Sequence, residues 1–115
     1  MDKELLKGNL DIVLLLLLSN KTMYGYEISK EIRDITNDSC QLGEGTLYPA
    51  LKRLEDKNYL ETYWEQVEGK DVKRKFYRAT KSGLLQLKIK LESWRQINTL
   101  IEKSLIKGVF SNESN

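Results

Sequence analysis

Histidine is absent from this chain of 115 residues, and cysteine and proline occur once each, as Cys40 and Pro49. Histidine is the commonest general base and the commonest metal ligand, so the usual means of acid–base or metal chemistry are missing. The acidic residues are scattered along predicted helices and lack the grouping of a metal site. A single cysteine excludes an intramolecular disulfide, as expected in a reducing cytosol, and Cys40 has no obvious resolving partner for a redox switch. We therefore expect no enzyme, no cofactor and no metal site.

Long apolar runs and a strong net charge are also missing. The apolar run Ile12–Leu18 is much shorter than the ~20 residues of a membrane-spanning helix, and no signal-peptide cleavage site follows it. We expect a soluble cytoplasmic protein without a membrane partner. The formal net charge is only +2, so any contact with nucleic acid must come from local clusters of cations.

The N-terminal part of the chain predicts two helices. The first, about Lys3–Ser19, is apolar around almost its whole circumference and must be covered on all sides, so we expect part of it, including Leu10, to meet a second subunit. A turn at Ser19–Thr22 leads into a second helix, about Tyr24–Thr36. Its apolar face carries Ile28, Ile32 and Ile35.

The segment Glu44–Glu55, which follows a polar loop at 37–43, begins with a cap-and-turn signal and continues as a short third helix. At ~100° per residue it has two distinct faces. The apolar face carries Leu47, Ala50, Leu51 and Leu54, and Tyr48, Pro49, Lys52 and Arg53 lie on or beside the other face. Thr46 as N-cap would place Pro49 at the third helical position, where proline is tolerated, whereas a cap near Glu44 would imply a distorted first turn. The segment 43–46 lacks the spacing and lysine of a phosphate-binding loop.

The C-terminal half predicts a β-hairpin followed by a long helix. Tyr59–Val67 and Val72–Ala79 are rich in aromatic and β-branched residues and flank a turn with glycine at position 69. Aromatic residues occur on both faces of the hairpin, so the sequence does not determine which face points toward the core. Thr80 is a good N-cap for a helix over 80–107, and residues 108–115 are expected to fray. A heptad stripe on this helix predicts a helix–helix seam: Leu84, Leu87, Leu91, Trp94, Asn98, Ile101 and Leu105.

This order of elements predicts a mainly α fold with a β-hairpin wing (α+β). It corresponds to a winged helix-turn-helix over residues 1–79 and a dimerisation helix over 80–107. In such a fold the third helix enters the major groove of DNA and the hairpin lies on the backbone or in the minor groove. Thr46, Tyr48 and Pro49 would then approach base edges. The cations that would neutralise phosphates are Lys52, Arg53, Lys70, Lys73, Arg74 and Lys75. Taken alone, Lys52 and Arg53 are better explained as solvated surface.

Three segments, MYGYEISKEI, EGTLYPALKRLE and KRKFYRATKSG, closely resemble the PadR family of bacterial transcription regulators, in the family's order and spacing. The resemblance implies a dimeric winged-helix repressor that releases DNA on binding a small effector. It implies that Tyr24 and Gly25 match the start of the family's second helix. It also assigns Thr46, Tyr48, Pro49, Lys52 and Arg53 to the recognition helix, and Lys73, Arg74, Lys75 and Tyr77 to the wing strand.

The segment LESWRQINTLIEK is similar to the short-tailed branch of this family that includes the lactococcal multidrug-resistance regulator. The resemblance implies that Trp94 faces its symmetry mate at the dimer interface and that planar aromatic drugs stack between the two indoles. Asn98 replaces an acidic residue of that regulator, which should weaken selection of cationic ligands. The alternatives are that Trp94 is plain interface core and that Asn98 fixes the register of the seam.

We therefore expect a homodimeric repressor that binds a pseudo-palindromic DNA operator and is released by a hydrophobic or aromatic small molecule. Two other classes of protein remain open. A winged-helix protein-interaction module would keep the fold without binding DNA, which the wing cations argue against. A ligand carrier would need Trp94 but no operator.

Overall fold

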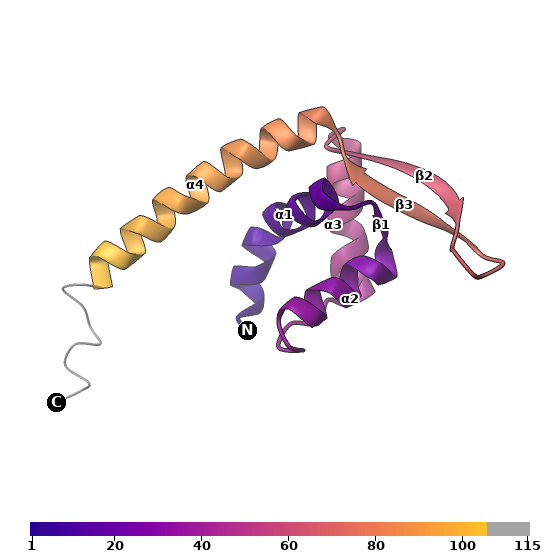
Figure 1. Cartoon of the computed structure of the whole chain (residues 1–115). Helices are drawn as coiled ribbons and strands as arrows, with labels where there is room; N and C mark the ends of the chain where they lie inside the picture. Colours follow the sequence, from indigo (N-terminus) through magenta and orange to yellow (C-terminus); the bar gives the residue numbers. More distant parts are fainter. Residues whose placement is uncertain (106–115) are drawn as a thin grey trace.

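The computed structural model describes residues 1–105: the first three helices lie together at the base of a β-hairpin that projects to one side, and the long last helix extends to the other side (Figure 1). In chain order the elements are α1 (Lys3–Asn20), β1 (Met23–Tyr24), α2 (Gly25–Ile35), α3 (Glu44–Asp56), β2 (Leu60–Gln66), β3 (Lys73–Ala79) and α4 (Lys81–Leu105). The strands form an antiparallel sheet in the order β1-β3-β2. This confirms the predicted α+β winged-helix fold. Strand β1 was not predicted, and the expected frayed tail lies outside the described residues.

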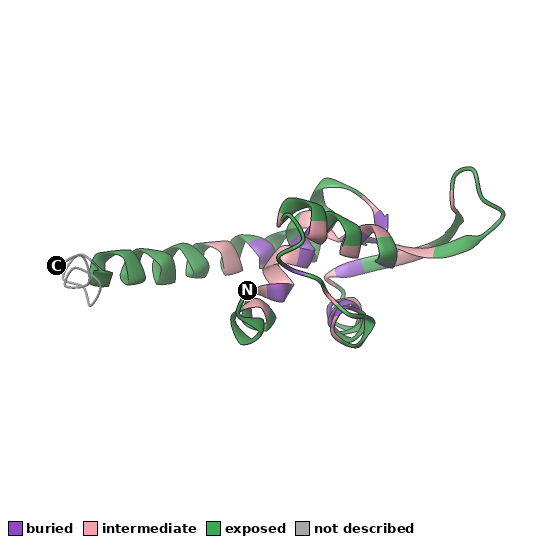
Figure 2. Cartoon of the chain, turned by 90° about the horizontal axis from the view of Figure 1, so that it is seen from below, coloured by how far each residue is buried: buried purple, intermediate pink, exposed green. Residues whose placement is uncertain are grey.

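The core lies between α1, α2, α3 and the base of the sheet (Figure 2). Leu14 and Leu15 of α1 are completely buried, and each such leucine contributes about 1.5–3 kcal/mol. Leu10, with 3% of its surface exposed, belongs to the same core. The prediction that Leu10 meets a second subunit is therefore wrong, because α1 packs against α3, α4 and β3 and this side chain is buried within the chain's own core. On α2, Ile28 and Ile32 are buried, but Ile35 is exposed because it lies at the helix end.

The start of α3 differs from the prediction. Gly43 is the N-cap, and its carbonyl accepts hydrogen bonds from the backbone N–H groups of Thr46 and Leu47 at 3.1 and 3.0 Å. Thr46 is therefore a helical residue and Pro49 lies inside the helix. A proline there removes the hydrogen bond to the carbonyl of residue 45. The helix tolerates this loss because Gly45 is exposed in the first turn, where water can solvate its carbonyl.

The strand register settles which face of the hairpin points inward. Thr62 lies opposite Tyr77 and Trp64 opposite Lys75, so these four side chains share one face. Tyr77 is buried and turns this face toward the core. The opposite face carries a row of rings in which Tyr24, Phe76 and Tyr63 contact one another at centroid distances of 5.2 and 5.9 Å. The base of the sheet is thus packed on both sides.

Helix α4 begins as predicted. The Thr80 hydroxyl accepts a hydrogen bond from the Gly83 N–H at 3.0 Å and donates one to the Asn58 carbonyl at 2.6 Å. The first turns of α4 pack on the core through Leu87 and Leu91. Beyond them α4 leaves the body on the side opposite the wing tip, and its distal part is exposed (Figures 1 and 2). None of the helices within residues 1–105 is long and apolar enough to cross a membrane.

Candidate functional site

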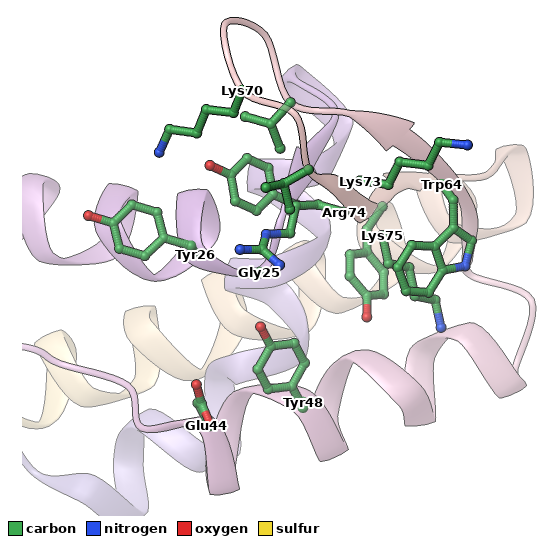
Figure 3. A pocket seen from close by; sticks show the side chains of 13 residues that line it. Gly25, Tyr26, Glu44, Tyr48, Trp64, Lys70, Lys73, Arg74 and Lys75 are labelled. Carbon is green, nitrogen blue, oxygen red and sulfur yellow. The ribbon is translucent and has the colours of Figure 1, made fainter.

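The wing, formed by β2, β3 and the turn between them, encloses a pocket of about 680 Å³ together with the start of α2 and the first turns of α3 (Figure 3). We call it the wing pocket. Its walls combine aromatic rings with cations: Tyr24, Gly25, Tyr26, Glu44, Tyr48, Trp64, Val67, Lys70, Val72, Lys73, Arg74, Lys75 and Tyr77. Glu44 is the single acidic residue among them. The arrangement suits a polyanionic partner with planar groups.

Tyr48 connects the two helices of the helix-turn-helix. Its ring reaches from α3 to the start of α2, where its hydroxyl lies against Gly25 (Figure 3). A Cβ atom at Gly25 would overlap this ring, so the ring can take this position only while residue 25 is a glycine. Tyr48 is still 44% exposed and presents its remaining surface to the wing pocket. The N–H of Tyr24 donates to the Glu27 carboxylate at 3.2 Å, which orients the start of α2.

The other predicted base-contacting residues face a different side of α3. Thr46 and Pro49 line a smaller pocket of about 260 Å³ between α1 and α3. The Arg53 guanidinium lines the same pocket and donates to the Asp11 carboxylate of α1 at 2.6 Å. The structure therefore does not bring Thr46, Pro49 and Arg53 together with the wing cations. Arg53 and Asp11 are 42 positions apart in sequence, so the periodicity of a single helix could not have predicted this ion pair.

The predicted wing cations fall into two groups. Lys70, Lys73 and Arg74 are exposed and form no ion pair with any residue that the structure describes. The Lys75 ammonium instead lies 3.1 Å from the Glu55 carboxylate in the last turns of α3. This hydrogen bond is the main reason why the pKa of the Glu55 carboxyl lies below its ordinary value of 4.5. Partial burial acts in the opposite direction and raises this pKa, whereas the hydrogen bond from the Thr62 hydroxyl lowers it further.

Two aromatic residues of the wing pocket, Trp64 and Tyr26, were not predicted from the sequence. Trp64 is 68% exposed and lies on the same face of the wing as Lys75 and Tyr77. Tyr26 is also exposed and stacks on Tyr24 at a centroid distance of 6.4 Å. The alternation of side chains along β2 could have placed Trp64 once the strand register was known. Without that register, the aromatic residues on both faces left the choice open.

A third pocket, of about 370 Å³, lies between α1 and α4, and we call it the α4 pocket. Its lining comprises Gly8, Asn9, Ile12, Gln86, Ile89, Lys90, Ser93, Trp94 and Ile97. Trp94 is 45% exposed at its edge. Asn98 is exposed and does not line this pocket.

The predicted seam residues of α4 also divide into two groups. Leu87 is buried in the chain's own core, so the prediction that it faces a second subunit is wrong. Leu91 packs against this core but is only partly buried, so for Leu91 the contact with a second subunit stays a prediction. The core covers Leu87 because α1 crosses the first turns of α4. The exposed apolar side chains of this helix include predicted and unpredicted positions: Leu84, Leu85, Ile89, Trp94, Ile97, Leu100, Ile101 and Leu105.

The fold and these surfaces can be compared with known proteins. Residues 13–89 match the transcriptional regulator PadR-like family. A transcriptional regulator from Clostridium thermocellum is 36% identical with a TM-score of 0.79, over 88% of this chain and 97% of that chain. A PadR family transcription regulator from Clostridium difficile R20291 is 38% identical with a TM-score of 0.72, over 84% of this chain and 97% of that one.

A protein of Lysinibacillus sphaericus that is described only as uncharacterized is 39% identical over 99 residues, which cover 86% of this chain and 90% of that protein. The match at the family level includes α2, α3 and the wing, which are the elements that build the wing pocket. The chain therefore belongs to the PadR-like family of transcriptional regulators.

Proposed function

We propose that the protein is a homodimeric transcriptional repressor that binds double-stranded DNA through α3 and the wing. The observation that supports this most directly is the wing pocket, where three exposed cations without an acidic partner among the described residues face the exposed Tyr48 of α3. Cations placed this way would displace counterions from phosphates, and the exposed surface of the Tyr48 ring on α3 would lie beside the bound duplex. A pseudo-palindromic operator would match the two-fold symmetry of a dimer.

The cations would have different roles on DNA. Lys70, Lys73 and Arg74 would contact phosphates directly. Lys52 is 74% exposed, and its pair with Asp56 lies within one helix at 3.3 Å, so it would exchange that weak partner for a phosphate. Arg53 is paired with Asp11, so it would fix α3 against α1 on the side of α3 away from the wing cations.

The exposed apolar side of α4 supports dimerisation through this helix. Leu84, Trp94, Ile101 and Leu105 keep between 43% and 52% of their surface exposed within one chain. An apolar surface of this extent on a helix that projects from the body is typical of an interface. A second copy of α4 would cover it and would give the seam that the heptad stripe predicts.

The effector would bind at the α4 pocket next to Trp94. Two symmetry-related indoles could enclose a planar aromatic or hydrophobic compound, as the resemblance to the multidrug-binding branch implies. Helix α1 offers a route from this site to DNA. Its residues Gly8 and Ile12 line the α4 pocket, and Asp11 of the same helix holds Arg53 of α3. A ligand that moves α1 would thus move α3, provided that it binds the DNA-incompetent state more tightly.

The experiment that tests DNA binding is fluorescence anisotropy with a labelled duplex from upstream of the protein's own gene, at two salt concentrations and against a scrambled duplex. We expect tighter binding to the upstream duplex, weakening with salt. Lys73→Ala should lower affinity and reduce the salt slope by about one unit. Lys88→Ala on α4, an exposed lysine away from the wing, is the matched control and should change neither. Equal and weak binding to both duplexes would point to an operator elsewhere in the genome or to a protein-interaction module.

The effector site is tested by quenching of tryptophan fluorescence with planar aromatic compounds. Quenching should disappear in Trp94→Ala and persist in Trp64→Phe. The operator duplex should weaken ligand binding in the same proportion as the ligand weakens DNA binding. Ligand affinity that ignores the duplex would indicate a ligand carrier, and quenching that survives in Trp94→Ala would place the ligand elsewhere.

A further inference from the structure

We propose that Glu55 is a positioning residue that holds the wing at a set angle to α3, and that Lys75 is its counter-ion rather than a phosphate contact. The inference rests on the proposed DNA binding, because the relative placement of α3 and the wing matters only if both engage the same duplex. It reassigns one of the predicted wing cations and adds an acidic residue to the functional set.

The geometry assigns one carboxylate oxygen of Glu55 to each wing strand. Oε1 accepts from the Lys75 ammonium of β3 at 3.1 Å, and Oε2 accepts from the Thr62 hydroxyl of β2 at 2.9 Å. The Lys75 ammonium also lies 5.5 Å from the centre of the Tyr77 ring, which restricts its side chain. Both acceptor atoms of a single side chain on α3 are thereby used by the wing.

This ion pair differs from the others that the structure describes. Lys52–Asp56 lies within α3, and Arg78–Glu61 lies within the wing. Glu55–Lys75 joins the two elements that would contact DNA, and its side chains are only 29% and 34% exposed. A partly buried pair with a second hydrogen bond is screened less by salt and holds its geometry better than an exposed pair.

The wing needs such a connection because it extends away from the core. Leu60 and Tyr77 are buried at its base, whereas Trp64, Lys73 and Arg74 are exposed farther along. Without Glu55 the strands beyond Tyr77 would be held mainly by each other. Loss of a set angle would force the duplex to order the wing on binding, which lowers affinity without removing any phosphate contact.

Exchanging the charges of Glu55 and Lys75 distinguishes a positioning ion pair from a contact between Lys75 and a phosphate. Glu55→Lys and Lys75→Glu should each weaken operator binding by about tenfold, which is a typical size for the coupling between two side chains that touch each other. The double variant Glu55→Lys/Lys75→Glu should regain most of the affinity, because the ion pair is restored with reversed polarity. If Lys75 contacts a phosphate, the double variant will stay as weak as Lys75→Glu, and the proposal is overturned.

The matched control is Lys73→Glu, alone and combined with Glu55→Lys. Lys73 lies on the same strand but is exposed and forms no ion pair with a described residue. Adding Glu55→Lys should not rescue Lys73→Glu. A rescue here would mean that an added positive charge strengthens DNA binding wherever it is placed on this surface, and would overturn the positioning role of Glu55.

A readout without DNA separates failure of this inference from failure of DNA binding. In NMR titrations, the Glu55 carboxyl should have a pKa below 4.5 in the native protein and should move back toward that value in Lys75→Met. Amide relaxation should show increased motion of Trp64–Gln66 in Glu55→Gln. If these changes occur but no duplex binds, the DNA function is wrong and the ion pair only stabilises the wing. If neither change occurs, the inference fails whether or not DNA binds.

Discussion

The hydroxyl of Tyr48 lies against the Cα of Gly25, and this contact leaves no room for a side chain at the start of α2. The two residues belong to different helices, so their contact sets how closely α2 approaches α3. Gly25 is needed here for the close approach of a ring, since it does not have a positive φ. The contact also orients Tyr48, which presents its remaining exposed surface to the wing pocket.

Gly25→Ala should destabilise the protein by about 1 kcal/mol, the low end of the overpacking range, because the added methyl group displaces the tip of the partly exposed Tyr48 side chain rather than backbone. Urea unfolding measures the change. Gly8→Ala is the control, since a Cβ at Gly8 meets no atom within 4 Å and an alanine in α1 should stabilise by about 0.5–1 kcal/mol. Effects of the same sign and size for both variants would contradict the contact.

The stabilising effect of Glu55 should depend on pH. Its pKa is lowered in the folded state, chiefly by the hydrogen bond from Lys75, so the stabilisation is present above the unfolded value of 4.5 and is lost as pH falls through the folded value. The difference in unfolding free energy between the native protein and Glu55→Gln should be constant near neutral pH and shrink below 4.5. Urea unfolding over this range measures it. A difference that grows on acidification would contradict the prediction.

Gly8→Leu should block the proposed effector site without unfolding the protein. Gly8 lines the α4 pocket, and a Cβ added there would meet no atom of another element within 4 Å, so a leucine can extend into the pocket. Quenching of Trp94 fluorescence by planar aromatic compounds should be lost, while the thermal unfolding temperature should not fall. Gly8→Ala should retain quenching because a methyl group fills little of the volume. Full quenching in Gly8→Leu would place the ligand outside this pocket.

Gly83→Ala should displace α4 from the body. A Cβ at Gly83 would overlap the backbone carbonyl of Tyr59, which cannot move aside as a side chain could. We expect a loss of about 3 kcal/mol, the upper part of the range for overpacking. Thr80→Ala, which removes the cap of the same helix, should cost only about 1 kcal/mol. Thermal unfolding of both variants tests the order, and a smaller loss for Gly83→Ala would contradict it.

Much of the local structure could be predicted from the sequence alone. The apolar face of α3, the Thr80 cap and the glycine turn of the hairpin depend on residues within a few positions of one another. Side-chain spacing and backbone preferences therefore suffice to identify them. The first turn of α3 was misplaced because a proline near a helix start is compatible with more than one N-cap.

Pairing between distant residues was decided by the tertiary structure. The sequence shows that Arg53 and Lys75 are basic and that Asp11 and Glu55 are acidic, but only the folded chain brings these residues within hydrogen-bonding distance. The same holds for the addition of β1 to the sheet and for the burial of Leu10 and Leu87. Periodicity determines which side of an element turns inward, whereas the packing of elements far apart in sequence determines what that side meets.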